Sequence, residues 1–232
     1  YDLGRHRDEG RDVSFLTMEY LAGETLAERL FARGRLNGEE ALRIAQGLAE
    51  GLDAAHRVGI VHRDFKSENV LLVPGKGEER VVITDFGLAM AAEWPSEAVR
   101  VTEAEVSVSD GMAGKPSEAT TQPIFPRLGS TSGLERFLGT PAYMSPEQVR
   151  GERVSSAADL YALGVTLFEM RTGVLPFRGK TPLETAQLRL VMPPPRPSTL
   201  VELEPEWEEA ILRLLSLDPE ARFVSAGEAV RS

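Results

Sequence analysis

One short polar run constrains this chain more than any other feature. It spans residues 62–69 and reads HRDFKSEN, which places an acid, a cation and an amide at Asp64, Lys66 and Asn69. The run lies between a long stretch of helical periodicity and the apolar segment 70–73, which is typical of a strand. Functional side chains often gather in loops that rigid elements position, so the sequence predicts a functional loop here.

Two further motifs follow in a fixed order. The tripeptide Asp85-Phe86-Gly87 comes directly after a second apolar segment, 81–84, and the run GTPAYMSPE occupies residues 139–147. Together the three motifs resemble the catalytic loop, the metal-binding motif and the substrate-side motif of protein kinases. The resemblance extends from about residue 13 to the C-terminus. It implies an α+β, protein-kinase-like fold, mainly the helical C-terminal lobe with a remnant of the N-terminal lobe sheet.

The resemblance divides the chain into two expected parts. Residues 1–20 would be a remnant of the small lobe and the entry to the hinge, and residues 21–232 would be the large lobe. Kinases also carry a Gly-rich loop and a strand lysine that position ATP. No lysine of this chain lies in such a strand, so we expect most of the small lobe to be absent and phosphoryl transfer by this chain alone to be weak. The lysines are Lys66, Lys76, Lys115 and Lys180.

Periodicity and capping residues predict the remaining elements. Asn37 is expected to cap a helix that continues to about Val58, and Ser155 or Ser156 to cap one that ends at Thr172. Residues 1–12 show no periodicity, which predicts a frayed segment. Shorter helices are expected near 25–31, 182–190, 205–217 and 225–230, and strands at 14–20, 70–73 and 81–84.

Residues 93–133 differ from the rest in composition. They are rich in Ser, Thr, Gly, Pro and Glu, which predicts a flexible insertion in the activation segment. In kinases with an arginine before the catalytic aspartate, this cation often pairs with a phosphorylated residue of that segment. The resemblance therefore makes Arg63, Thr131 and Ser132 regulatory candidates. A flexible loop without any regulatory event is the alternative.

The resemblance also assigns chemistry to individual residues. Asp64 would orient the acceptor hydroxyl and take its proton, and Lys66 would offset charge on the transferred phosphoryl group. Asn69 and Asp85 would hold Mg²⁺, which prefers hard oxygen ligands. The pattern Asp-x-Lys-x-x-Asn and the hydroxyl of Thr140 resemble serine/threonine kinases. For Asp64 taken alone, an ordinary solvated loop acid is the alternative.

An ATP pocket is implied at the hinge. Met18 would gate the space behind the adenine, and backbone groups of Glu19 and Leu21 would bond its edge. Leu71 would pack beneath the ring, and Glu24 would reach the ribose. Met18, Glu19, Leu21 and Leu71 would at the same time be ordinary strand and core residues.

A last set of residues would hold the site together. His62 and Phe86 resemble part of a stacked hydrophobic spine, and a general-base role for His62 is disfavoured because the resemblance gives that role to the loop aspartate. Asp159 would turn inward and accept hydrogen bonds from the catalytic-loop backbone. Glu147 and Arg222 would form a buried ion pair that fixes the substrate-side loop.

Composition excludes several other classes of function. The net charge of −10 argues against a general nucleic-acid surface and a polybasic membrane patch. The absence of Cys excludes disulfides, thiolate zinc sites and Cys nucleophiles. The apolar run Leu160–Met170 is too short for a membrane span. We expect a cytoplasmic chain, with a membrane anchor outside this sequence left open.

Two functions are compatible with these patterns. The first is a bacterial-type serine/threonine protein kinase that uses ATP and Mg²⁺ on Ser or Thr of protein substrates, with self-phosphorylation as a further expectation. The bacterial character is suggested by the segments 18–20 and 145–148. The second is a catalytically inactive, kinase-like binding or scaffolding module, because half of the nucleotide site has no match in this chain.

Overall fold

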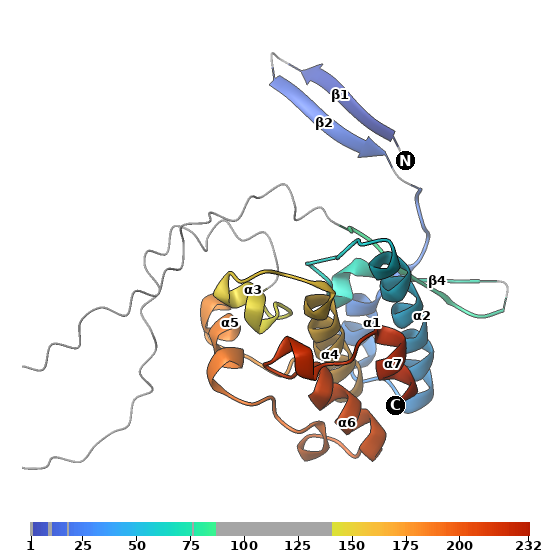
Figure 1. Cartoon of the computed structure of the whole chain (residues 1–232). Helices are drawn as coiled ribbons and strands as arrows, with labels where there is room; N and C mark the ends of the chain where they lie inside the picture. The colour runs from blue at the N-terminus through green and yellow to red at the C-terminus, as the bar shows by residue number, and fades with distance from the viewer. Residues whose placement is uncertain (1, 9–10, 18, 76, 87–140) are drawn as a thin grey trace, which may run out of the picture.

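The computed structural model describes residues 2–8, 11–17, 19–75, 77–86 and 141–232. It has the predicted α+β composition, with a helical body and two small antiparallel sheets (Figure 1). In chain order the elements are β1 (Asp2–Asp8), β2 (Arg11–Thr17), β3 (Glu24–Thr25), α1 (Leu26–Arg33), α2 (Gly38–Arg57), the 3₁₀ turn η1 (Ser67–Asn69), β4 (Val70–Val73), β5 (Arg80–Ile83), α3 (Pro146–Arg150), α4 (Ser156–Thr172), α5 (Pro182–Val191), η4 (Pro197–Thr199), α6 (Pro205–Leu214), η5 (Pro219–Ala221) and α7 (Ala226–Arg231).

Strands β1 and β2 form an antiparallel hairpin, in which Asp2 pairs with Thr17 and Asp8 with Arg11. The expectation of a frayed segment at residues 1–12 is therefore wrong. The pairing of two strands is held by backbone hydrogen bonds, so a strand of mostly charged residues can form without the alternating apolar pattern that is typical of strands. The strand expected at 14–20 begins and ends three residues earlier.

Helix α4 forms the centre of the helical body. Ser155 caps its first turn by accepting a hydrogen bond from the backbone of Ala157, and Gly173 ends it with φ 76°. Nearly all of its side chains are buried, and it packs against α2 and α6. A helix that is apolar on all sides is typical of such a central position. The predicted helix from residue 155 or 156 to Thr172 is confirmed.

Helix α2 is amphipathic and covers one side of this core. Asn37 caps it through a hydrogen bond from the backbone of Glu40, as the sequence predicts. Its apolar face, which includes Ile44, Leu48 and Leu52, contacts α4, α7 and β5. Residues 58–61 connect the end of α2 to the polar run at residues 62–69, so the helix fixes where this run begins.

The C-terminal end of the polar run leads directly into a small sheet. Its strand order is β3-β4-β5, and all neighbours are antiparallel. Leu72 of β4 pairs with Glu24 of β3 and with Val81 of β5. The sequence reads as a turn at β3, because a strand of two residues is too short to show a period. Residues 62–69 are thus held between α2 and the sheet.

The C-terminal helices complete the body. Asp53 of α2 accepts hydrogen bonds from the backbone of Ala226 and Gly227, at 2.9 Å each, and so fixes the start of α7. Helix α6 ends at Leu214, three residues before its expected end. Helix α3 was not expected, although Ser145 and Gln148 form a capping box at its start.

Several predictions concern residues outside the described part of the chain. These are the insertion at 93–133 and the residues Met18, Thr131, Ser132 and Thr140. The division at residue 20 stays a prediction. Within the described ranges, every helix is either too short or too polar to cross a membrane.

The close approach of α2 to β5 requires a glycine. A Cβ added at Gly47 would lie 2.7 Å from Cβ of Val81. We predict that Gly47→Ala lowers the free energy of unfolding by about 1–2 kcal/mol, because overpacking exceeds the gain of about 1 kcal/mol that Ala brings to a helix. Urea unfolding followed by circular dichroism measures this change. The exposed neighbour Gln46 provides the control Gln46→Ala, and a more stable Gly47→Ala variant would contradict the packing described.

Candidate active site

The polar run is anchored by a buried carboxylate from the central helix. Asp159 of α4 is 1% exposed. Its Oδ1 accepts a hydrogen bond from the backbone N–H of Arg63 at 2.8 Å. Its Oδ2 accepts one from the backbone N–H of His62 at 2.8 Å and contacts Nε2 of His56 at 2.7 Å. The family resemblance implied the contacts of Asp159 with the loop backbone. It did not imply the contact of Asp159 with His56.

Two residues of the site have left-handed backbone conformations. Arg63 has φ 67° and Asp85 has φ 61°, and among the described residues they are the non-glycine residues with positive φ. Such conformations are costly for residues with a Cβ and persist where surrounding bonds hold them. At Arg63 the holding bond comes from Asp159. The carbonyl of Arg63 also accepts a hydrogen bond from Gln148 Nε2 at 2.7 Å.

His62 links the polar run to the end of β5. Its Nε2 lies 2.8 Å from the carbonyl oxygen of Thr84, which can only accept, so Nε2 carries the proton. Nδ1 is then the acceptor for the backbone N–H of Asp64, at 3.4 Å. The ring is fully buried and lies 4.6 Å from the ring of Phe86 and 5.7 Å from that of Phe65, centroid to centroid. With both nitrogens engaged in the fold, His62 is a packing residue.

Asp64, Lys66 and Asn69 form a compact polar group. Nζ of Lys66 lies 2.9 Å from Oδ2 of Asp64. The amide nitrogen of Asn69 donates to the backbone carbonyl of Asp64, also at 2.9 Å. Asn69 is buried, whereas Asp64 is partly exposed and can be reached from solvent. The Asp64 carboxylate is therefore accessible, whereas Asn69, which binds its backbone, is buried.

The same group is joined to Asp85. The carbonyl oxygen of Asn69 accepts hydrogen bonds from the backbone N–H of Thr84 at 2.9 Å and from its hydroxyl at 3.2 Å. Asp85 follows directly and is exposed. Because the Asn69 amide nitrogen is already donating, its Oδ1 is the atom suited to a cation. In the described part of the chain, no group of three or more His, Cys, Asp or Glu is placed so that it could hold a metal ion.

A buried hydrogen-bond chain ties the polar run to the substrate-side loop. Tyr143 Oη donates to Oε2 of Glu169 at 2.5 Å and lies 2.8 Å from Oγ of Ser67. A phenol has one proton, so Ser67 donates to Tyr143 while Tyr143 donates to Glu169. Burial raises the pKa of the Glu169 carboxyl and, together with that carboxylate, the pKa of Tyr143. No sequence pattern predicts the roles of Ser67 and Glu169.

The loop is fixed at its far end by an ion pair. Arg222 Nη1 and Nη2 reach the two carboxylate oxygens of Glu147 at 2.7 and 2.9 Å, and both side chains are buried. Burial alone would raise the pKa of Glu147, but the hydrogen bonds and charge of Arg222 hold it below its ordinary value. The predicted contact between these residues, 75 positions apart, is present in the structure.

The residues expected to bind ATP differ in their surroundings. Glu19 is exposed, and Leu21 and Leu71 are partly exposed, so their surfaces can contact a ligand. Glu24 instead lies 2.6 Å from Arg29, which also binds Glu79 and Glu40. The hydrogen bond to Glu79 raises the pKa of Arg29. No sequence pattern predicts this network, because its members share no motif and are separated by up to 55 residues.

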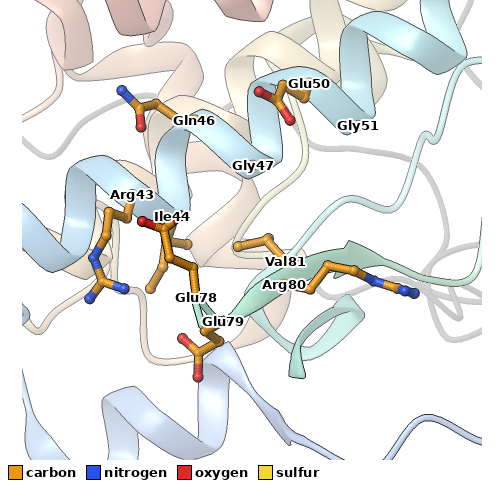
Figure 2. A pocket seen from close by; sticks show the side chains of 10 residues that line it. All are labelled: Arg43, Ile44, Gln46, Gly47, Glu50, Gly51, Glu78, Glu79, Arg80 and Val81. Carbon is orange, nitrogen blue, oxygen red and sulfur yellow. The ribbon is translucent and has the colours of Figure 1, made fainter. Parts of the chain in front are cut away.

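A hollow of about 490 Å³ lies elsewhere, along the middle of α2 (Figure 2). It is bounded by Gly47 and Gly51 of α2 and by the segment 78–81. Its charged residues, which include Arg43 and Glu50, have both signs. No candidate catalytic residue lines it. The candidate catalytic residues therefore lie outside this hollow.

Comparisons with known proteins show which family this chain is similar to. The sequence model of the protein kinase domain matches residues 7–232. The serine/threonine-protein kinase pkn3 of Myxococcus xanthus is 35% identical over 229 residues, which are 97% of this chain and 36% of that protein. The serine/threonine-protein kinase PknL of Mycobacterium tuberculosis is 32% identical over 222 residues, 94% of this chain and 46% of that protein. The chain thus spans less than half the length of these relatives.

A solved structure supports the fold. A mutant of the PknI kinase domain from Mycobacterium tuberculosis superimposes with a TM-score of 0.61 and 22% sequence identity. The match covers 98% of this chain and 66% of that one. The predicted protein-kinase-like fold is confirmed.

The Glu147–Arg222 pair yields a prediction for stability. Glu147→Ala leaves Arg222 buried without its partner, so we expect the free energy of unfolding to fall by about 3–5 kcal/mol. Because the pKa of Glu147 is lower in the folded chain, its contribution is present above the ordinary Glu pKa and is lost as the pH falls through the folded value. Denaturant titrations at several pH values measure both effects.

Glu152 provides the control, because it is exposed and 4.0 Å from Arg150. Glu152→Ala is expected to change stability by less than about 0.5 kcal/mol. Equal losses in the two variants, or a Glu147→Ala variant that keeps the wild-type stability, would contradict the importance of the buried pair.

Proposed function

The chain belongs to the protein kinase domain family, and we propose that it carries the phosphoryl-transfer machinery of a serine/threonine protein kinase. The observation that supports this most is the connected group around Asp64. Lys66 contacts the Asp64 side chain, Asn69 binds the Asp64 backbone, and the Asn69 carbonyl binds the residue before Asp85. Four residues are thus held in one arrangement, in which Asn69 and Thr84 are bonded through backbone carbonyls and Lys66 contacts one carboxylate oxygen of Asp64.

Asp64 would act on the acceptor hydroxyl. Its carboxylate is partly exposed, so a Ser or Thr hydroxyl can donate to it and transfer its proton as the oxygen attacks phosphorus. Lys66 lies beside the carboxylate and would offset negative charge on the phosphoryl group in transit. Phosphoryl transfer needs little more from the protein than alignment and charge compensation.

Asn69 and Asp85 would hold magnesium, and the hinge side would hold adenosine. The amide oxygen of Asn69 and the carboxylate of Asp85 would be its protein ligands, and the bound cation would offset the negative charge of the phosphates. Backbone groups of Glu19 and Leu21 would bond the adenine edge, with Leu71 beneath the ring and Met18 behind it. Glu24 would reach the ribose only by sharing its carboxylate with Arg29.

Regulation would act through the arginine beside the catalytic aspartate. Arg63 is exposed, and its backbone is bonded to Asp159 and Gln148. A phosphate on Thr131 or Ser132 would add charge-assisted bonds to its guanidinium. Through the Arg63 carbonyl and Gln148, that binding would tighten the start of α3.

The substrates would be proteins with Ser or Thr acceptors, the chain's own segment 93–133 included. Thr140 would bond the catalytic Asp64 and Lys66, in keeping with a serine/threonine enzyme. A cytoplasmic location fits both the intracellular supply of ATP and the absence of Cys. An inactive binding module is the alternative that the following measurement excludes or supports.

Substitutions in the full-length protein separate the proposed roles. Asp64→Asn should lower phosphoryl transfer to a basic protein acceptor by about 10²–10⁴-fold while Mg-ATP binding is retained, since only proton transfer and acceptor orientation are lost. Asp85→Asn should also weaken magnesium-dependent nucleotide binding. Transfer of ³²P from ATP and fluorescence titration with a labelled nucleotide measure the two properties.

The exposed Asp218, which caps η5, provides the control Asp218→Asn with unchanged activity. If Asp64→Asn and Asp85→Asn changed phosphoryl transfer and Mg-ATP binding to the same extent, the separate roles of Asp64 and Asp85 would be refuted. A full-length wild-type protein that binds partners but transfers no phosphate would favour the scaffolding alternative.

A further inference from the structure

Arg189 of α5 is a buried cation that binds backbone rather than an acidic side chain. It is 2% exposed, and in the described ranges its guanidinium forms no ion pair with a carboxylate. Nη1 donates to the carbonyl of Met144, and Nη2 donates to those of Pro141 at 2.7 Å and Ala142 at 3.1 Å. A buried charge is tolerated only when it is well bonded. The buried position of Arg189 therefore requires the carbonyls of residues 141–144, and the position of those carbonyls is fixed by Arg189.

The guanidinium has little freedom to follow the loop if the loop moves. Its Nε donates to the carbonyl of Ala186 one turn back on α5, at 3.1 Å. Its central carbon lies 5.8 Å from the ring centroid of Tyr161 and 5.7 Å from that of Phe177, within the range of cation–π attraction. Helix α5 and the core thus orient the cation, and the cation orients the loop.

Residues 141–144 are consequently held by two different helices. The Tyr143 side chain reaches Glu169 of α4 and Ser67 of the polar run. The carbonyls of the residues around it reach Arg189 of α5. Ser67 follows Asp64 by three positions, so the loop lies beside the group proposed to receive the acceptor hydroxyl.

We propose that Arg189 is a positioning residue for the protein acceptor. It fixes the backbone of residues 141–144 in the shape against which the acceptor segment lies, and thereby sets affinity for the acceptor without affecting affinity for ATP. The inference rests on the proposed kinase function. The residues assigned to the nucleotide, Leu71 and Glu24 among them, belong to other elements.

Lysine is the informative replacement at this position. It keeps the charge and most of the apolar stem, but a single ammonium on a flexible chain cannot donate in three directions with the fixed spacing of a guanidinium. Arg189→Lys therefore removes the positioning while leaving a cation near the carbonyls. Arg196 is 71% exposed and pairs with Glu208 at 3.4 Å, so Arg196→Lys is the matched control.

The first measurement is hydrogen–deuterium exchange of the full-length protein, which does not need activity. In Arg189→Lys we expect faster exchange in peptides covering residues 142–149 and unchanged exchange in peptides covering α2 and α4. Unchanged exchange at 142–149 would overturn the inference. Faster exchange throughout the helical body would also overturn it, because Arg189 would then serve global stability.

The second measurement is steady-state transfer to a peptide acceptor. Arg189→Lys should raise KM for the acceptor by about tenfold, the equivalent of one lost hydrogen bond of about 1.4 kcal/mol, with KM for ATP and slow ATP hydrolysis unchanged. Equal losses for acceptor and ATP would overturn the inference. A wild-type protein without transfer would count against the proposed function instead, and the exchange data would still decide whether Arg189 holds the loop.

Discussion

The carboxylate of Asp159 is the interaction on which the rest of the site depends. It enters the loop from the most buried helix and binds two successive backbone N–H groups, those of His62 and Arg63. These bonds hold Arg63 in a left-handed conformation that an arginine rarely adopts. The turn at Arg63 then presents Asp64 toward solvent, while His62 points into the core. A reactive loop is thus built on a rigid, buried support, which is how precise positioning is achieved.

Helix α4 supports both sides of the proposed reaction. Asp159 holds the catalytic loop, and Glu169, ten positions later and about 15 Å along the helix axis, holds Tyr143 of the substrate-side loop. Two hydrogen bonds connect these loops. Ser67 bonds the hydroxyl of Tyr143, and Gln148 donates to the carbonyl of Arg63. A buried helix that carries two carboxylates for different loops fixes their separation, because the helix itself cannot stretch. Arg189 and Arg222 then secure the substrate-side loop from α5 and from the segment before α7.

The sequence predicts those parts of the fold that local patterns encode. The caps at Asn37 and Ser155 and the periodicity after them locate α2 and α4 almost to the residue. The contact between Glu147 and Arg222 came from the family resemblance, since no periodicity joins residues so far apart. β1 was missed because its ladder uses backbone groups, and β3 because two residues carry no period. His56, Ser67, Glu169 and Arg189 were missed because each acts through a distant partner that tertiary packing alone supplies.

The most direct test of this account is the substitution Asp159→Asn in the full-length protein. Asparagine offers one acceptor oxygen where the carboxylate offers two, and its amide hydrogens would face the N–H donors of the loop. The control is Asp53→Asn, a capping carboxylate outside the site. The account predicts faster amide exchange at residues 62–65 and a loss of transfer of about a hundredfold, because one bond to the loop backbone is lost and the other is no longer charge-assisted. Nucleotide binding and the exchange of α2 should be unchanged. Wild-type transfer together with wild-type exchange at residues 62–65 would contradict the central role of Asp159.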